Sequence, residues 1–163
     1  RDREGTYPLP EAQLDRFMFA IELKYPSVEE ETRIVKTTTN DEFTEVNPLF
    51  NAEEILEVQH LVRRIPVPDN VVDYAVNLVN NTRPGLKTSS DYVKQYLDWG
   101  AGPRASQNLI LGAKAHAAIN GKFSPDIEDV QAVAMGILRH RIIKNYKAEA
   151  EGISEEDIIN KLL

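Results

Sequence analysis

Residues 103–120, PRASQNLILGAKAHAAIN, decide how this chain folds. A proline suits the first turn of a helix, where its missing N–H costs nothing, and Gly121 suits the position just past the end. Small side chains recur along the segment, at Ala105, Gly112, Ala113, Ala115, Ala117 and Ala118. Because small residues let neighbouring helices approach closely, we expect a helix from Pro103 to about Asn120 at the centre of a helical bundle.

Helical patterns continue on both sides of this segment. A capping box at Ser27 and a cap at Asn51 open two helices, and proline or glycine breaks separate the others. We expect these further helices over about 28–37, 52–65, 69–81, 90–99 and 124–144, and from Ser154 to the end. The helix over 52–65 should bury one apolar face, made of Ile55, Val58, Leu61, Val62 and Ile65. The helix over 69–81 should bury another, made of Val72, Ala75, Val76 and Val79.

The N-terminal stretch breaks the helical pattern. Residues 1–16, RDREGTYPLPEAQLDR, have neither helical nor alternating periodicity and are expected to form a loop. Residues 17–23, FMFAIEL, are apolar and aromatic and end before Tyr25-Pro26, which favours a buried strand. No second apolar run could pair with this strand. The predicted fold class is therefore mainly α, a helical bundle preceded by a loop and one strand.

The composition is that of a globular protein and argues against several classes of function. The chain has 163 residues, of which 42% are hydrophobic and 28% charged, and a net charge of −7. This acidic balance argues against a broad nucleic-acid surface, and no apolar run is long enough to cross a membrane. The absence of cysteine and of a signal-peptide pattern favours a cytoplasmic protein. His60, His116 and His140 are far apart in sequence, so no metal site is expected.

No motif for nucleotide hydrolysis is complete in these residues. Gly85-Leu86-Lys87-Thr88 is only superficially like a phosphate-binding loop, because the lysine does not follow the glycine directly and Asn80 stands where the first glycine is required. Asp41-Glu42 has the acidic pair of a Walker B site but lacks the apolar strand before it. We therefore expect no enzyme activity from this chain alone.

Two arginines are candidate functional residues. Arg104 follows Pro103 in the first turn of a helix, where the partial positive charge of the helix disfavours a cation. It is either exposed or directed at an anion that the helix N-terminus also holds. Arg16 lies between Asp15 and the predicted strand, and its local context alone fits an exposed or Asp15-paired arginine.

A second group of cations lies at the end of the helix predicted over 124–144. Arg139, Arg141 and Lys144 fall in its last turns, where a positive charge complements the helix dipole. We expect them to be surface charges that stabilise the helix end.

Three stretches of the chain resemble the MoxR-type AAA+ ATPases. Residues 4–17, EGTYPLPEAQLDRF, are similar to the segment that follows sensor 1 in that family. Residues 99–106, WGAGPRAS, resemble its sensor 2 motif. Residues 138–142, LRHRI, and 149–152, EAEG, are similar to its last stretch. These matches occur in the family's order and span nearly the whole chain.

The resemblance implies that the chain is the C-terminal part of a longer ATPase. Residues 1–25 would be a remnant of the αβα core, with the arginine-finger loop and the last strand, and residues 26–163 the helical lid. Walker A, Walker B and sensor 1 would lie upstream of Arg1.

The resemblance also assigns roles to the two candidate arginines. Arg16 would be the arginine finger, which reaches the γ-phosphate of ATP in the neighbouring subunit. Arg104 would be the sensor 2 arginine, which contacts the phosphate in its own subunit. ATP and Mg²⁺ would serve the parent protein, with none bound to this chain alone.

The family further implies a homo-oligomeric ring, expected to be a hexamer, with a chaperone-like function. A protein with a von Willebrand factor A domain is a candidate partner, whereas neither nucleic acid nor a membrane is expected to be one. The residues leave a second hypothesis open, a self-sufficient helical module that binds a protein partner and in which both arginines are structural.

Overall fold

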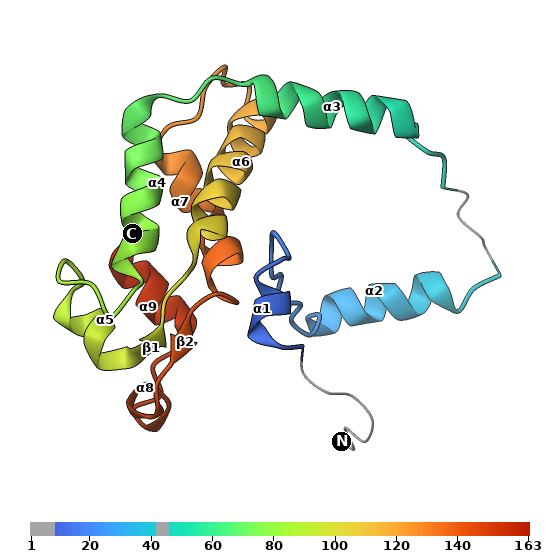
Figure 1. Cartoon of the computed structure of the whole chain (residues 1–163). Coiled ribbons are helices and arrows are strands. Elements are labelled where there is room, and N and C mark those ends of the chain that lie inside the picture. The colour runs from blue at the N-terminus through green and yellow to red at the C-terminus, as the bar shows by residue number, and fades with distance from the viewer. Residues whose placement is uncertain (1–8, 42–45) are drawn as a thin grey trace.

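The computed structural model describes residues 9–41 and 46–163, and this part of the chain is mainly helical (Figure 1). Residues 4–8 of the first family-like stretch and Glu42 of the acidic pair lie outside the described residues. The helices are α1 Glu11–Leu14, α2 Val28–Thr38, α3 Ala52–Arg64, α4 Asp69–Asn81, α5 Asp91–Tyr96, α6 Pro103–Ile119, α7 Ile127–Leu138, α8 Tyr146–Ala150 and α9 Glu155–Leu162. Two short strands complete the order, β1 Leu97–Trp99 before α6 and β2 Ile143–Lys144 after α7.

The predicted helix starts are confirmed where a capping side chain was identified. Each of these helices begins with a capping box, at Ser27, Asn51 and Ser154. The side chain of the capping residue accepts a hydrogen bond from the backbone N–H of the third helical residue. The carboxylate of that third residue accepts one from the backbone N–H of the capping residue. The helix predicted over 69–81 is α4. Local capping chemistry thus fixes these boundaries without help from distant residues.

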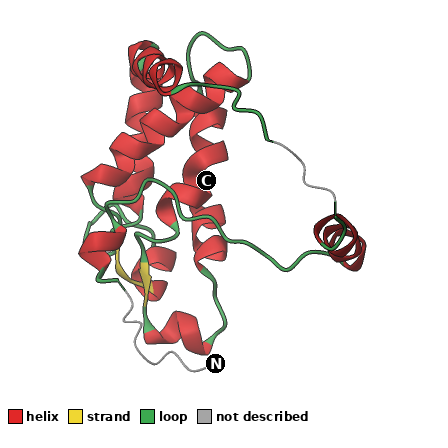
Figure 2. Cartoon of the chain, turned by 90° about the vertical axis from the view of Figure 1, so that its right-hand side faces the viewer, coloured by secondary structure: helices red, strands yellow, loops and turns green. Residues whose placement is uncertain are grey.

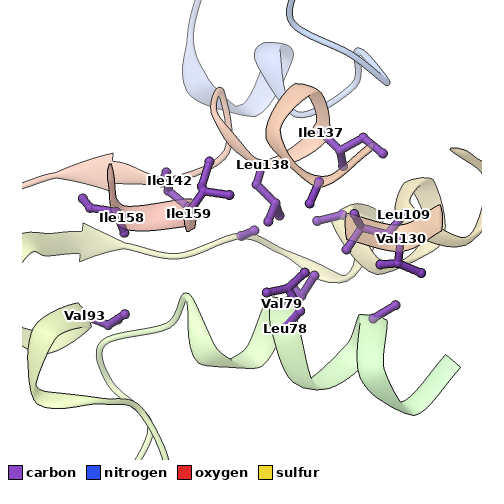
Figure 3. Packing of buried hydrophobic residues seen from close by; sticks show 14 of the residues in the cluster. Leu78, Val79, Val93, Leu109, Val130, Ile137, Leu138, Ile142, Ile158 and Ile159 are labelled. Atoms are coloured by element: carbon purple, nitrogen blue, oxygen red, sulfur yellow. The ribbon is translucent and has the colours of Figure 1, made fainter. Parts of the chain in front are cut away.

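Helix α6 lies at the centre of the bundle, as its small residues predict. It packs against α4 and α7, and its residues Ala105, Leu109 and Ala113 are fully buried. A Cβ added to Gly112 would lie 3.2 Å from side-chain atoms of Val133 and Ile137 on α7, so the glycine lets α6 and α7 pack closely at this point. Figure 3 shows side chains from α4, α6, α7 and α9 meeting in the same core.

The strand predicted over residues 17–23 is wrong. These residues form no regular secondary structure, with bends at Phe17 and Met18, and pair with no strand in the described part of the chain. The segment instead runs past the C-terminal half of α7, where the Ala20 N–H donates to the Gly136 carbonyl at 2.8 Å. A Cβ on Gly136 would lie 2.9 Å from the Phe19 ring, so the glycine gives the ring room to approach α7.

The sheet that does form uses residues expected to be helical. Strands β1 and β2 are antiparallel, with Leu97 opposite Lys144 and Trp99 opposite Ile143. The helix predicted over 90–99 therefore ends at Tyr96, and the one predicted over 124–144 is shorter at both ends. Helix α7 begins after Asp126, which caps it, and Arg139, Arg141 and Lys144 all lie beyond its last residue.

The apolar faces of the N-terminal helices are exposed. No residue of α2 or α3 is buried, and Ile55, Val58 and Leu61 of α3 remain 48%, 51% and 60% exposed. The other two residues of that face, Val62 and Ile65, are only half-buried, so the buried face predicted for the helix over 52–65 is wrong. Helix α2 stands apart from the body formed by α4 to α9 in both views (Figure 1 and Figure 2), and α3 contacts that body through α6.

On α4 the predicted buried face is only partly correct. Ala75 and Val79 are buried as expected, together with Val71 and Leu78. Val72 and Val76 lie on the rim of that face and are 37% and 41% exposed.

A buried carboxylate holds the turn between α6 and α7. Asp129 is fully buried and accepts hydrogen bonds from His116 Nδ1 at 2.6 Å, Lys122 Nζ at 3.0 Å and the Asp126 N–H at 2.9 Å. Burial raises the pKa of this carboxyl, but the Asp126 N–H, His116 and Lys122 outweigh it, so the pKa falls from 3.8 to about 2.

We expect the fold to lose stability in acid through Asp129. A carboxyl whose pKa is lower in the folded state stabilises the fold above the usual value of 3.8, and this contribution disappears as the pH falls through about 2. A shift of this size corresponds to about 2 kcal/mol. Urea unfolding between pH 5 and pH 2 measures it, and the Asp129→Asn variant should show a correspondingly smaller change. An equally steep loss in that variant would assign the acid sensitivity to other carboxyls.

The loop before α6 lies directly on the end of α4. The Ala101 N–H donates to Thr82 Oγ1 at 2.9 Å, and Arg83 Nε donates to the Ala101 carbonyl at 2.9 Å. Thr82 itself is fully buried. A Cβ on Gly100 would lie 2.6 Å from the Arg83 Cα and still closer to the Thr82 carbonyl oxygen. Only glycine allows this approach, which fixes where α6 begins.

Gly100→Ala should therefore destabilise the fold by about 2–3 kcal/mol, because backbone atoms cannot yield to the added methyl group. Gly85→Ala is the matched control, since a Cβ there meets nothing within 4 Å and should change the unfolding free energy by less than about 1 kcal/mol. Denaturant unfolding of both variants measures the difference. Equal stability of the two would contradict the close approach.

Candidate functional site

The candidate site is built around the first turn of α6. Gly102 is the N-cap and provides no side-chain hydrogen bond, Pro103 occupies the first turn, and that turn contains no acidic residue. Arg104 therefore lies at a helix start that no side chain caps and that carries the partial positive charge of the helix dipole, as the sequence predicts. The contacts of the preceding loop with α4 hold this end in place.

Asp15 links Arg104 to the N-terminal loop, residues 15–20, which follows the short helix α1 in a region where the sequence predicts only loop. Its Oδ2 accepts a hydrogen bond from Arg104 Nη1 at 2.7 Å, and its Oδ1 accepts one from Arg141 Nε at 3.0 Å. The carboxylate thus lies between two guanidinium groups. Asp15 forms no ion pair with its neighbour Arg16 in the described part of the chain, which contradicts the Asp15-paired interpretation of Arg16.

Arg141 is not the surface charge that the sequence predicts. Its side chain is only 1% exposed, because β2 and the end of α7 carry it inward beneath the N-terminal loop. Besides Asp15 Oδ1, its guanidinium donates to the backbone carbonyls of Asp15, Phe17 and Met18 in the loop and to that of Ile137 in α7. These five hydrogen bonds match the five N–H groups of a guanidinium, so the buried cation is fully satisfied.

Burial lowers the pKa of Arg141, and the Asp15 carboxylate partly offsets this effect. A guanidinium titrates far above neutral pH, so Arg141 stays cationic.

His140 contacts the same loop from the other side. Its Nε2 lies 3.0 Å from the Phe17 carbonyl, to which the neutral ring donates, while its Nδ1 is buried without a partner among the described residues. Burial lowers the pKa of His140, and Arg141 adds to this effect while the Phe17 carbonyl and Asp15 oppose it. A neutral imidazole at pH 7 follows.

Arg16 lies between Asp15 and Phe17, whose backbone carbonyls Arg141 binds. The Arg16 side chain, in contrast, is exposed and forms no ion pair with any residue in 9–41 or 46–163. It lines a cavity of about 770 Å³ together with Arg104. The structure therefore brings the two predicted site residues to one cavity of the same chain.

Several residues of the site escape sequence reasoning. Asp15 and Arg141 are 126 positions apart, so no local pattern connects them. Arg141 falls in the LRHRI stretch that resembles the family, but that likeness alone gives it no contact partner. Arg63, at the end of α3, lines the same cavity and carries no sequence signal of its own.

Two negative findings apply to residues 9–41 and 46–163. No three His, Cys, Asp or Glu side chains there are grouped so that they could hold a metal ion. None of the helices in these ranges combines the length and the apolar character that crossing a membrane requires.

Arg141→Met should release the N-terminal loop. The change removes the only cation that binds three loop carbonyls at once among the described residues, and breaking buried charge contacts costs about 3–5 kcal/mol. Amide hydrogen exchange should become much faster at Ala20, whose N–H is bonded to Gly136. Arg139→Met is the control, because Arg139 pairs with Glu22 and Glu156 near the surface and should cost about 1 kcal/mol or less. Similar exchange rates in the two variants would disprove the role of Arg141.

Relatives of known sequence match nearly the whole chain. Residues 90–162, which include α5 to α9, match the family model described as the AAA lid domain. The chain is 36% identical over 162 residues to Chaperone MoxR1 of Mycobacterium tuberculosis, covering 99% of this chain and 43% of the relative. It is 32% identical over 163 residues to the uncharacterized protein YeaC of Bacillus subtilis, covering 98% of this chain and 48% of the relative. The chain thus spans less than half the length of these curated relatives.

A solved structure has the same fold. A Cytophaga hutchinsonii protein, provisionally described as an ATPase, matches with a TM-score of 0.89 and 38% sequence identity, covering 99% of this chain and 49% of that chain. The mainly helical fold, the lid match and the sequence identity agree with one another. The chain belongs to the MoxR-type AAA+ family, and residues 90–162 are its AAA lid domain.

Proposed function

We propose that this chain contributes the lid, with sensor 2, and the arginine-finger loop to a MoxR-type ATPase. The observation that carries the proposal is the position of Arg104, which projects from the uncapped start of a central lid helix beside the loop that bears Arg16. A guanidinium and a helix N-terminus at one place suit a phosphate group. Arg104 would contact the phosphate bound to its own subunit.

Arg16 suits a role that acts between subunits. It is exposed and free of ion pairs in the described residues, while the backbone around it is held by Arg141. A fixed backbone with an unpaired guanidinium can reach a neighbour's γ-phosphate with little loss of conformational freedom. Arginine fingers contribute about 10³–10⁵ in rate by stabilising the transferred phosphoryl group.

Arg16, Arg104 and the start of α6 suit the phosphates of ATP, and no group of three or more His, Cys, Asp or Glu side chains that could hold a metal ion lies in the described part of the chain. ATP bound with Mg²⁺ would supply the phosphoryl group whose negative charge both arginines recognise. Asp15 would hold Arg104 until a phosphate oxygen replaces it, and Asp15 would then keep its bond to Arg141. The lid helix would thereby respond to nucleotide while the Arg16 loop stays in place.

We further propose that the complete protein forms a homo-oligomeric ring, expected to be a hexamer, in the cytoplasm. A chaperone-like function and a partner with a von Willebrand factor A domain would fit such a ring. Mycobacterium tuberculosis MoxR1, to which the chain is similar, is named a chaperone.

A second function is favoured by the exposed apolar faces of α2 and α3. Val58 and Leu61 line an open cavity of about 560 Å³ on α3, and Val28 and Val35 line another on α2. A helical module that binds a protein partner would use such faces. That function requires neither Arg16 nor Arg104.

Arg16→Ala in the complete ATPase separates the two functions. We expect ATP binding to persist and turnover to fall by about 10³, because the finger acts on a neighbour's nucleotide. Rings that mix this variant with a Walker-lysine variant should recover part of the activity, since each subunit supplies what the other lacks. A steady-state ATPase assay of the mixtures measures this recovery.

Two outcomes would count against the proposal. Mixed rings without recovered activity would remove the role of Arg16 between subunits. Unchanged turnover in Arg104→Ala would remove the sensor 2 role and leave the interaction module as the better account.

A further inference from the structure

We propose that α2 of one copy of this chain packs, in antiparallel orientation, on α3 of the next copy. No residue of either helix is buried, and each has an exposed apolar face beside an open cavity, of about 400 Å³ on α2 and about 560 Å³ on α3. Within one chain neither face covers the other, because the two helices lie apart (Figure 1). The inference rests on the homo-oligomeric ring proposed above and names a surface that joins its subunits. It requires neither Arg16 nor Arg104.

The two faces differ in the size of their side chains. The lining of the α2 cavity includes the short side chains of Val28, Thr32 and Val35, and that of the α3 cavity includes the larger Phe50 and Leu61. Because large side chains pack well over short ones, α2 fits α3 better than either helix fits a second copy of itself. A contact between unlike faces repeats from one copy to the next, and such contacts close into a ring when the rotation allows it.

Each helix is acidic in its first turn and basic in its last. The acidic residues are Glu29, Glu30 and Glu31 on α2 and Glu53 and Glu54 on α3, and the basic ones are Lys36 on α2 and Arg63 and Arg64 on α3. Antiparallel packing therefore places the acidic end of each helix against the basic end of the other, whereas parallel packing would place like charges together. A second copy thus offers a complementary surface, even though the whole chain has a net charge of −7.

The spacing of the lining residues sets the register of this contact. Thr32 and Val35 are three positions apart on α2, as are Val58 and Leu61 on α3. An antiparallel alignment with Val35 opposite Val58 therefore also has Thr32 opposite Leu61. The residues that line the two cavities then meet along one seam.

One ion pair follows from this register. Lys36 comes directly after Val35 and Glu57 directly before Val58, so the alignment places Lys36 beside Glu57 of the next copy. Both side chains line their cavities and are exposed, and neither forms an ion pair within residues 9–41 and 46–163. The pair is therefore available for a contact between copies.

Analytical ultracentrifugation of the 163-residue chain at low ionic strength, over a range of concentrations, tests the inference. We expect self-association, weakened by about fivefold in Lys36→Glu and in Glu57→Lys, because each change brings like charges together. An equimolar mixture of the two variants should recover the affinity, since the reversed residues attract each other across the contact. Packing of α2 on α3 within one chain would give no such recovery. Asp73→Lys, an exposed charge reversal on α4, is the matched control for Glu57→Lys and should weaken association by less than about twofold.

The complete ATPase supplies a second readout, because the rest of the protein is then present. Its rings should dissociate more readily on dilution in Lys36→Glu than in Asp73→Lys. The double variant Lys36→Glu/Glu57→Lys should restore them, because it returns opposite charges to the contact.

Three results would overturn the inference. The first is a chain that stays monomeric at every concentration. The second is an equal loss of association in Glu57→Lys and Asp73→Lys, or no recovery in the mixture. The third is unchanged ring stability in the complete Lys36→Glu protein, which would mean that another part of that protein covers these faces. None of these results bears on Arg16 and Arg104, whose ATPase assays test the proposed function separately.

Discussion

The buried guanidinium of Arg141 joins the two parts of this chain that carry the candidate arginines. A cation taken out of water is costly unless every donor finds an acceptor, and Arg141 finds one acceptor for each of its N–H groups. Three of these acceptors are carbonyls of the N-terminal loop, so the loop cannot leave without exposing an unpaired buried charge. This constraint places Asp15 beside Arg104 and leaves Arg16 exposed next to it.

Asp15 gives this constraint a functional consequence. Because its two carboxylate oxygens bind different arginines, one bond can be exchanged while the other holds the loop. In the proposed ATPase, a phosphate would compete only for the bond to Arg104. A response to nucleotide could then move the start of α6 relative to a loop that keeps its own shape.

The boundary expected between a core remnant (1–25) and a lid (26–163) stays a prediction. Arg141, which falls in the expected lid, binds residues of the expected core remnant.

Sequence patterns predict the elements whose chemistry is local. Ser27, Asn51 and Ser154 cap helices through residues three positions away, and the small residues of α6 predict its central place. Residues 17–23 have the composition of a strand, but composition does not reveal whether a partner strand exists. Apolar periodicity likewise predicts a face on α3 without showing whether anything covers it.

The residues of the site also divide into those that local sequence identifies and those that depend on distant contacts. Arg104 can be identified from its position after a helix-starting proline, and Arg16 from its likeness to a family motif. Asp15 and Arg141 bind each other across 126 positions of sequence, and Arg63 lines the cavity of Arg16 and Arg104 only because the fold brings α3 there. Arg141 in particular resembles an ordinary charge at a helix end, because the sequence does not show that α7 stops at Leu138.

The side-chain NMR signals of the arginines test the central claim most directly. With each N–H bonded, the Arg141 guanidinium should give separate, slowly exchanging Nη–H signals at neutral pH, whereas those of exposed Arg16 should average and exchange rapidly with water. Arg141→Lys and Arg16→Lys variants assign the signals. If the Arg141 signals average and exchange as fast as those of Arg16, then Arg141 does not hold the N-terminal loop on the lid, and this account of the site is wrong.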